Sequence, residues 1–212
     1  MKNCDATNNV FLSGTIKQPP IFSHESYGEG FYEVMVEVAR LSEQVDLVPV
    51  TVSEKIMGNK FEEGKNISIK GQFRSYNKII DGKSKLVLTV FVREILDNDE
   101  SLNPNIVELS GFICKPPVYR TTPFNREICD ILIAVNRAYN KSDYIPCITW
   151  GRNARYARDA EIGSSIEIVG RVQSRSYQKR LEDGSVEDRI AYEVSVGKIF
   201  IKSQQVEDVV QP

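Results

Sequence analysis

Two segments in the second half of the chain alternate large aromatic or arginine side chains with small or apolar ones. In the first segment, Tyr144 and Trp150 share one side of a period-2 pattern, and Ile145, Cys147 and Thr149 form the other. If the second side fills a core, both aromatic rings point outward. In the second segment the outward side holds Arg171, Gln173, Arg175 and Tyr177. Nucleobases stack on aromatic faces and guanidinium groups bind phosphates, so this combination favours an interface with single-stranded nucleic acid. The same pattern also fits aromatic side chains that cover a subunit interface or cap the barrel.

Other residue types argue against catalysis and against a metal centre. The 212-residue chain has one histidine, His24, in a polar stretch that we interpret as a surface loop. Both Ser-His and Cys-His mechanisms would depend on that histidine. The four cysteines show no CxxC spacing. We therefore expect no enzymatic activity, no metal site and no cofactor.

Charge is distributed unevenly along the chain. The formal net charge is -2, which argues against a strongly basic polyanion binder for the chain as a whole. However, residues 1–104 contain three arginines and residues 105–212 contain ten. Arginine is the residue best suited to forked phosphate contacts and to base stacking. The second half is therefore the half in which we expect most of the nucleic-acid binding.

The chain contains an internal duplication with an offset of 97 residues. Residues 8–20 and 105–117 are identical at eight of 13 positions. Further along, Gly71 matches Gly170, and we align Arg74–Tyr76 with Arg175–Tyr177. The join between the copies is expected near Asp97–Pro104.

Each copy has the strand order of a small barrel. In the first copy, period-2 alternation predicts strands at residues 10–16, 34–38, 48–52, 67–73 and 88–92. Helical segments are expected at Ser53–Phe61 and, in the second copy, at Arg152–Ala160. Five strands with a helix between the third and fourth is the order of the OB-fold. We expect an all-β protein with short helices, built as two tandem OB-fold five-stranded Greek-key barrels, in residues 1–100 and 105–203, followed by a short polar tail at 204–212.

Four segments of the second copy resemble the bacterial single-stranded DNA-binding protein family. They are Asn105–Ile113, Ala134–Arg137, Ser142–Arg152 and Gly170–Tyr177. The resemblance implies that DNA bases stack on aromatic side chains at Tyr139, Tyr144, Trp150 and Tyr177, with Arg137, Arg152, Arg171 and Arg175 as phosphate-binding candidates. The corresponding positions of the first copy are Ser42, Leu47, Ser53 and Tyr76, so only Tyr76, beside Arg74, retains an aromatic ring. We therefore expect a degenerate binding face in the first copy.

The predicted function is sequence-tolerant binding of single-stranded DNA, which protects the strand in replication, recombination or repair. A family branch with two OB-folds per chain implies a homodimer with four OB-folds. Four cysteines without CxxC pairing indicate reduced thiols and a cytoplasmic protein, and no apolar run approaches the length of a membrane span, so we expect no membrane partner. Replication or repair proteins are further possible partners, although the tail lacks the family's acidic tip. The alternative is a protein-interaction module of a replication-restart or mobile-element complex that binds DNA weakly. Loss of aromatic residues in the first copy favours this alternative.

Overall fold

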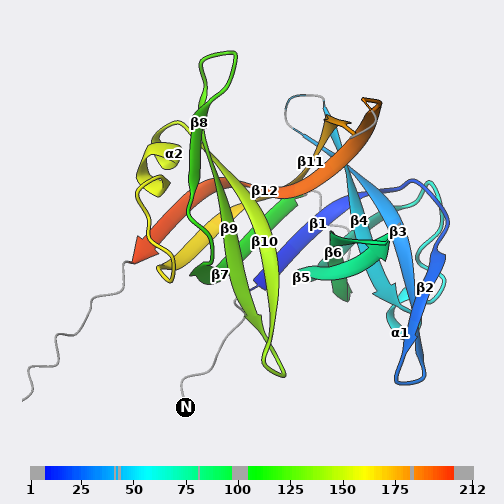
Figure 1. Ribbon diagram of the computed structural model, residues 1–212. Helices are drawn as coiled ribbons and strands as arrows, with labels where there is room; N and C mark the ends of the chain where they lie inside the picture. The colour runs from blue at the N-terminus through cyan, green and yellow to red at the C-terminus, as the bar shows by residue number, and fades with distance from the viewer. Residues whose placement is uncertain are drawn as a thin grey trace, which may run out of the picture.

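The computed structural model describes residues 8–40, 42, 44–80, 82–96, 105–181 and 184–202. Two β-barrels lie side by side, each formed by one copy of the duplication (Figure 1). The first barrel comprises β1 (Asn8–Ile16), β2 (Ile21–Ser26), β3 (Glu29–Ala39), β4 (Val45–Ser53), α1 (Glu54–Met57), β5 (Asn66–Ile80) and β6 (Lys83–Leu96). The second comprises β7 (Asn105–Ile113), β8 (Val118–Thr121), β9 (Glu127–Arg137), β10 (Lys141–Trp150), α2 (Arg152–Ala157), β11 (Ser165–Arg180) and β12 (Val186–Lys202).

Each barrel closes through five strands. In the first, β1 pairs with β3, β3 with β4, β4 with β6 in parallel, β6 with β5, and β5 again with β1. The second barrel repeats this ring with β7, β9, β10, β12 and β11. The predicted all-β fold with two five-stranded OB barrels is confirmed. The expected join at Asp97–Pro104 and the tail at 204–212 lie outside the described residues.

The sequence prediction missed one strand in each copy. Strand β2 pairs with β3 outside the barrel ring, and β8 pairs with β9 in the same way. Both strands are largely exposed and therefore lack the alternation that marks a half-buried strand. As a result His24 lies in strand β2 and not in the loop that we predicted. The helices are also shorter than predicted and end at Met57 and Ala157.

The buried sides of the strands form the barrel interiors as their alternation predicts. In β10, the side chains of Ile145, Cys147 and Thr149 are buried, whereas Tyr144 and Trp150 are exposed. In β1, Val10, Leu12 and Ile16 are buried in the same way. The pleat therefore sends one set of side chains inward, although Ile148, on the other side of β10, is also buried.

The two barrels are joined by main-chain pairing and by a pair of buried aspartates. Strands β1 and β7 pair antiparallel at the centre of the molecule (Figure 1). Asp46 of the first barrel accepts hydrogen bonds from the Ser174 backbone N–H at 2.7 Å and from the Arg40 guanidinium. Asp143 of the second barrel accepts the equivalent bond from the Ser75 backbone N–H at 2.8 Å. Each barrel thus places a carboxylate against a strand of the other barrel.

This symmetry corrects our alignment of the two copies. Because Asp46 and Asp143 are equivalent, Ser75 corresponds to Ser174, not to Ser176. Strand pairing agrees, since Tyr76 faces Val87 as Arg175 faces Ala191. Tyr76 is therefore equivalent to Arg175, and the match with Tyr177 is wrong by two residues, a shift that keeps the same face of the strand.

Candidate nucleic-acid interface

The outer face of β10 presents two aromatic rings to solvent. Tyr144 is 46% exposed and Trp150 39% exposed, and the strand carries them six residues apart. The Trp150 indole N–H donates a hydrogen bond to Ser195 Oγ of β12 at 3.3 Å, which fixes the edge of the ring and leaves part of its surface open. An exposed ring that is oriented in this way suits base stacking.

Strand β11, which β12 separates from β10, carries a further arginine and tyrosine. The Arg175 guanidinium lies 5.7 Å from the centre of the Tyr177 ring and 3.6 Å from a carboxylate oxygen of Glu193. Gln173, predicted on the exposed side, is instead buried because its amide donates to Glu193 at 2.7 Å. Glu193 thus ties both residues to β12, a contact that strand alternation alone does not reveal.

Tyr139 lies at the tip of the β9–β10 hairpin. Its side chain is 94% exposed. Its φ is 63°, and the φ of the following Asn140 is also positive, so the turn holds the ring away from the barrel. This is the most accessible of the predicted stacking residues, and its position is set by the hairpin rather than by packing.

The four predicted arginines of the second barrel differ in their surroundings. Arg171 donates to Asp46 of the other barrel at 3.3 Å, and Arg137 donates to Asp143 at 3.3 Å. Arg171 therefore also joins the two barrels, whereas the Arg137–Asp143 pair lies within the second barrel. Arg152 begins α2 and is exposed, and Arg175 faces Glu193 and Tyr177 as described above.

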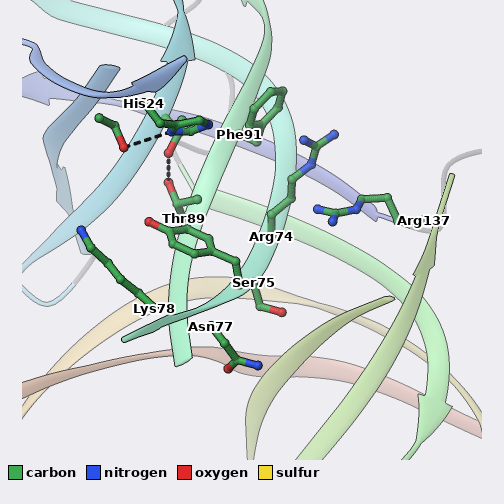
Figure 2. Close-up of a pocket in the computed structure, with 11 residues that line it drawn as sticks. His24, Arg74, Ser75, Asn77, Lys78, Thr89, Phe91 and Arg137 are labelled. Carbon is green, nitrogen blue, oxygen red and sulfur yellow. Dashed lines mark hydrogen bonds between the residues drawn. The ribbon is translucent and has the colours of Figure 1, made fainter. Parts of the chain in front are cut away.

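The first barrel carries aromatic rings at positions that our family-based prediction did not include. The His24 and Phe31 rings stack with centres 5.0 Å apart, and Phe31 lies 5.7 Å from Phe91. The Arg74 guanidinium lies 3.7 Å over the Phe91 ring (Figure 2). Phe91 is equivalent to Ser195 of the second barrel, since Val90 and Val194 occupy matching places in the two sheets. A comparison of the copies at every strand position would have revealed this exchange.

Two cavities bring the predicted residues of both copies together. One, of about 400 Å³, includes Tyr76 and Phe91 of the first barrel and Arg137 of the second in its lining. The other, of about 780 Å³, includes Arg74, Arg137 and Tyr139. Trp150, Tyr177 and Arg152 line neither cavity.

The electrostatic environment of the first-barrel residues is strongly perturbed. Burial, with the charges of Arg93 and Arg137, lowers the pKa of Arg74 to about 10. Burial, together with the charge of Glu33 and its hydrogen bond with the phenol, raises the pKa of Tyr76. The cationic form of Arg74 is therefore destabilised where it stands, and a bound anion would stabilise it.

Comparison with known proteins identifies the family. The profile of the single-strand binding protein family matches residues 104–200. The single-stranded DNA-binding protein B of Bacillus subtilis is 32% identical over 81 residues, which cover 35% of this chain and 72% of that protein. The chain belongs to the single-strand binding protein family. The single-stranded DNA-binding protein 1 of Lactococcus lactis is 34% identical over 83 residues, 36% of this chain and 55% of the relative. The chain thus spans about half the length of the latter relative.

A solved structure extends the similarity in fold to both barrels. The wild-type single-stranded DNA-binding protein of Thermus aquaticus has a TM-score of 0.71 at 19% identity and covers 93% of this chain and 94% of its own. At this identity the likeness concerns the fold alone. In the described part of the chain, no helix is long and apolar enough to cross a membrane.

Proposed function

We propose that this protein binds single-stranded DNA with little sequence preference and without catalysis. Bases stack on Tyr139, Tyr144, Trp150 and Tyr177, and arginines hold the phosphates. Binding of this kind protects the strand in replication, recombination or repair. Names of the relatives agree with this reading, since those of Bacillus subtilis and Lactococcus lactis are called single-stranded DNA-binding proteins.

The observation that carries the proposal is the outer face of β10. Single exposed aromatic residues are common on protein surfaces, whereas several gathered on one face mark an interaction site. Tyr144 and Trp150 are both exposed on this strand, and Arg175 and Tyr177 lie on β11, which pairs with the same strand β12 as β10 does. Every base has a face that stacks on such rings, which makes the binding tolerant of sequence.

Assembly and location form part of the same proposal. Residues 1–100 and 105–203 act as two OB-fold units, and two copies of the chain associate into a homodimer with four such units. The protein works in the cytoplasm, with no membrane partner, and its other partners are replication or repair proteins.

The experiment is a titration of Trp150 fluorescence with thymidine oligonucleotides of increasing length, at low and at moderate salt. Trp150 is the only tryptophan, so the signal reports the second barrel alone. We expect quenching, and an affinity that falls with salt concentration because phosphate contacts release counterions. Absence of quenching at low salt, with the fold intact, would remove the proposal and favour a protein-interaction module that binds DNA weakly.

A matched pair of tyrosine variants makes the titration specific. Tyr144→Ala removes a ring from the proposed face, whereas Tyr27→Ala removes an exposed ring at the β2–β3 turn. The first variant should lower the affinity about five-fold or more, which is the loss of one stacked base, and the second should leave it unchanged.

A further inference from the structure

Three arginines from both barrels meet at the barrel junction. Arg74 comes from β5, Arg93 from β6 and Arg137 from β9, and all three line the cavity of about 780 Å³ together with Lys141. Figure 2 shows the side chains of Arg74 and Arg137 directed into the same space from the two barrels. Four cations and one carboxylate, that of Asp143, thus face one cavity in a chain whose formal net charge is -2.

The charge of this cluster is only partly compensated. Among the ion pairs of the described residues, Arg137 pairs with Asp143 at 3.3 Å, and no pair includes Arg74 or Arg93. The Arg74 guanidinium instead donates to the neutral amide oxygen of Gln72 at 2.9 Å. The lowered pKa of Arg74 has the same origin, because its like-charged neighbours and its burial both oppose the cation. An anion with several oxygen atoms would satisfy all three guanidinium groups.

The smaller cavity adjoins this cluster and has a different lining. It shares Arg74 and Arg137 with the larger one and continues along His24, Phe91 and Tyr76. Its volume of about 400 Å³ falls within the range of small-molecule sites. A phosphate-binding cluster next to aromatic side chains is the combination that holds one nucleotide of a single strand.

We propose that Arg74, Arg93 and Arg137 bind a phosphate group of single-stranded DNA at the barrel junction, and that the cavity at His24, Phe91 and Tyr76 receives the adjacent base. The strand then continues from the face of the second barrel onto a rebuilt face of the first. This inference rests on the proposed function and adds to it a path for the DNA. In this proposal the first copy binds DNA through aromatic residues at other positions than those that the second copy uses.

The test uses the full chain and two oligonucleotide lengths. An oligonucleotide of about 8 nucleotides is short enough for one OB-fold, and one of about 30 nucleotides spans two. The short oligonucleotide is followed by Trp150 quenching, and the long one by polarisation of a label at its end. The three variants are Arg93→Ala, Phe91→Leu and His24→Ala. The side chains of Arg93 and His24 are exposed in the wild type. Lys17→Ala, which removes an exposed cation of the first barrel outside both cavities, is the control.

We expect the variants to bind the short oligonucleotide as the wild type does and the long one more weakly. Phe91→Leu and His24→Ala should each lower the affinity for the long oligonucleotide about five-fold or more. Arg93→Ala should reduce the salt dependence of its binding by about 0.7 in the log–log slope, the value of one phosphate contact on a single strand. Lys17→Ala should change neither quantity.

The outcomes separate the two proposals. If the wild type binds both lengths and the variants match it in affinity and salt slope, the junction site is wrong and the proposed function stands. If the wild type binds neither length, the proposed function falls. A third outcome is that a poly-glutamate peptide binds and that Arg93→Ala removes this binding without weakening the binding of the long oligonucleotide. The cluster would then recognise an acidic protein segment, and the inference would be overturned.

Discussion

The two barrels share their buried contacts and differ in their exposed aromatic rings. In the second barrel, β10 carries Tyr144 and Trp150, whereas the equivalent positions of β4 hold Leu47 and Ser53. In the first barrel the rings lie on β2, β3 and β6 instead, and Phe91 takes the place of Ser195. A comparison limited to the family's stacking positions therefore does not include these rings, because they lie on other strands.

The buried polar contacts explain why the framework stayed the same. Asn8 bonds both the N–H and the C=O of Phe73, and Asn105 bonds those of Val172 in the same way. A buried donor or acceptor that loses its partner costs about 1–3 kcal/mol, whereas an exposed ring on a strand can be exchanged at little cost to folding. Duplication thus preserves the interior of a barrel and leaves its surface free to diverge.

The largest expected effect concerns the second barrel. The double variant Trp150→Ala with Tyr177→Ala should weaken binding of a labelled thymidine oligonucleotide by about 2–6 kcal/mol, since each stacked base contributes about 1–3 kcal/mol. Tyr76→Ala should weaken the binding by no more than the contribution of one stacked base. Polarisation titrations of the three proteins measure the difference. Equal losses in the double variant and in Tyr76→Ala would contradict the asymmetry.

The two junction aspartates should differ in their effect on stability. Asp46 accepts bonds from Arg40 and Ser174 and lies near Arg171, whereas Asp143 has one arginine at 3.3 Å. Asp46→Asn leaves partly buried guanidinium groups without a counter-charge, so we expect a loss near the lower end of about 3–5 kcal/mol in the free energy of unfolding. Asp143→Asn should cost less, about 1–3 kcal/mol. Urea denaturation measures both, and the reverse order would contradict the assignment.

The effect of Asp46 should depend on pH in a defined direction. Burial opposes its ionisation, but the hydrogen bonds from Arg40 and Ser174, with the charges of Arg40 and Arg171, lower the pKa of Asp46 below its ordinary value. Its ionised form therefore contributes stability above the unfolded pKa of about 3.9, and that contribution is lost as the pH falls through the folded pKa. The difference in stability between the wild type and Asp46→Asn should stay constant near neutral pH and shrink below about pH 4. A difference that grows on acidification would exclude this role.

The equivalent asparagines should give equal, smaller effects. Asn8→Ala and Asn105→Ala each remove two hydrogen bonds to a buried strand, so each should cost about 1–3 kcal/mol of unfolding free energy. Thermal or urea denaturation under the same conditions measures the pair. A large effect in only one barrel would show that the two frameworks are less alike than their hydrogen bonds indicate.

The smallest effect is expected at a surface ion pair whose equivalent positions in the first barrel, Ser23 and Glu33, share a hydrogen bond instead. Arg120 of β8 lies 2.9 Å from Asp130 of β9, and both side chains are substantially exposed. Arg120→Ala should change the stability by less than about 1 kcal/mol, because exposed ion pairs are well solvated. A larger loss in denaturation would mean that the outer strand supports the second barrel.

The sequence predicted the regular parts of this structure and missed the parts that depend on tertiary contacts. Alternation identified the five barrel strands, because their two sides face a core and a solvent. Strand β2 has no buried side, and its residue His24 was therefore placed in a loop. The sequence did not indicate that Gln173 is buried against Glu193 or that Arg171 pairs with Asp46, since both partners come from distant segments. Phe91 was overlooked because its place beside β4, the first-barrel equivalent of β10, depends on the register of β4 against β6.

Ultraviolet crosslinking of the chain to a thymidine oligonucleotide, with the crosslinked peptides identified by mass spectrometry, tests the central claim most directly. If both barrels hold the strand on different sets of rings, crosslinks should form at Trp150, Tyr144 or Tyr177 and also at Phe91, Tyr76 or His24. Crosslinks confined to the second barrel would contradict the path across the junction. Crosslinks found only at exposed rings outside both faces, such as Phe124, would contradict the account as a whole.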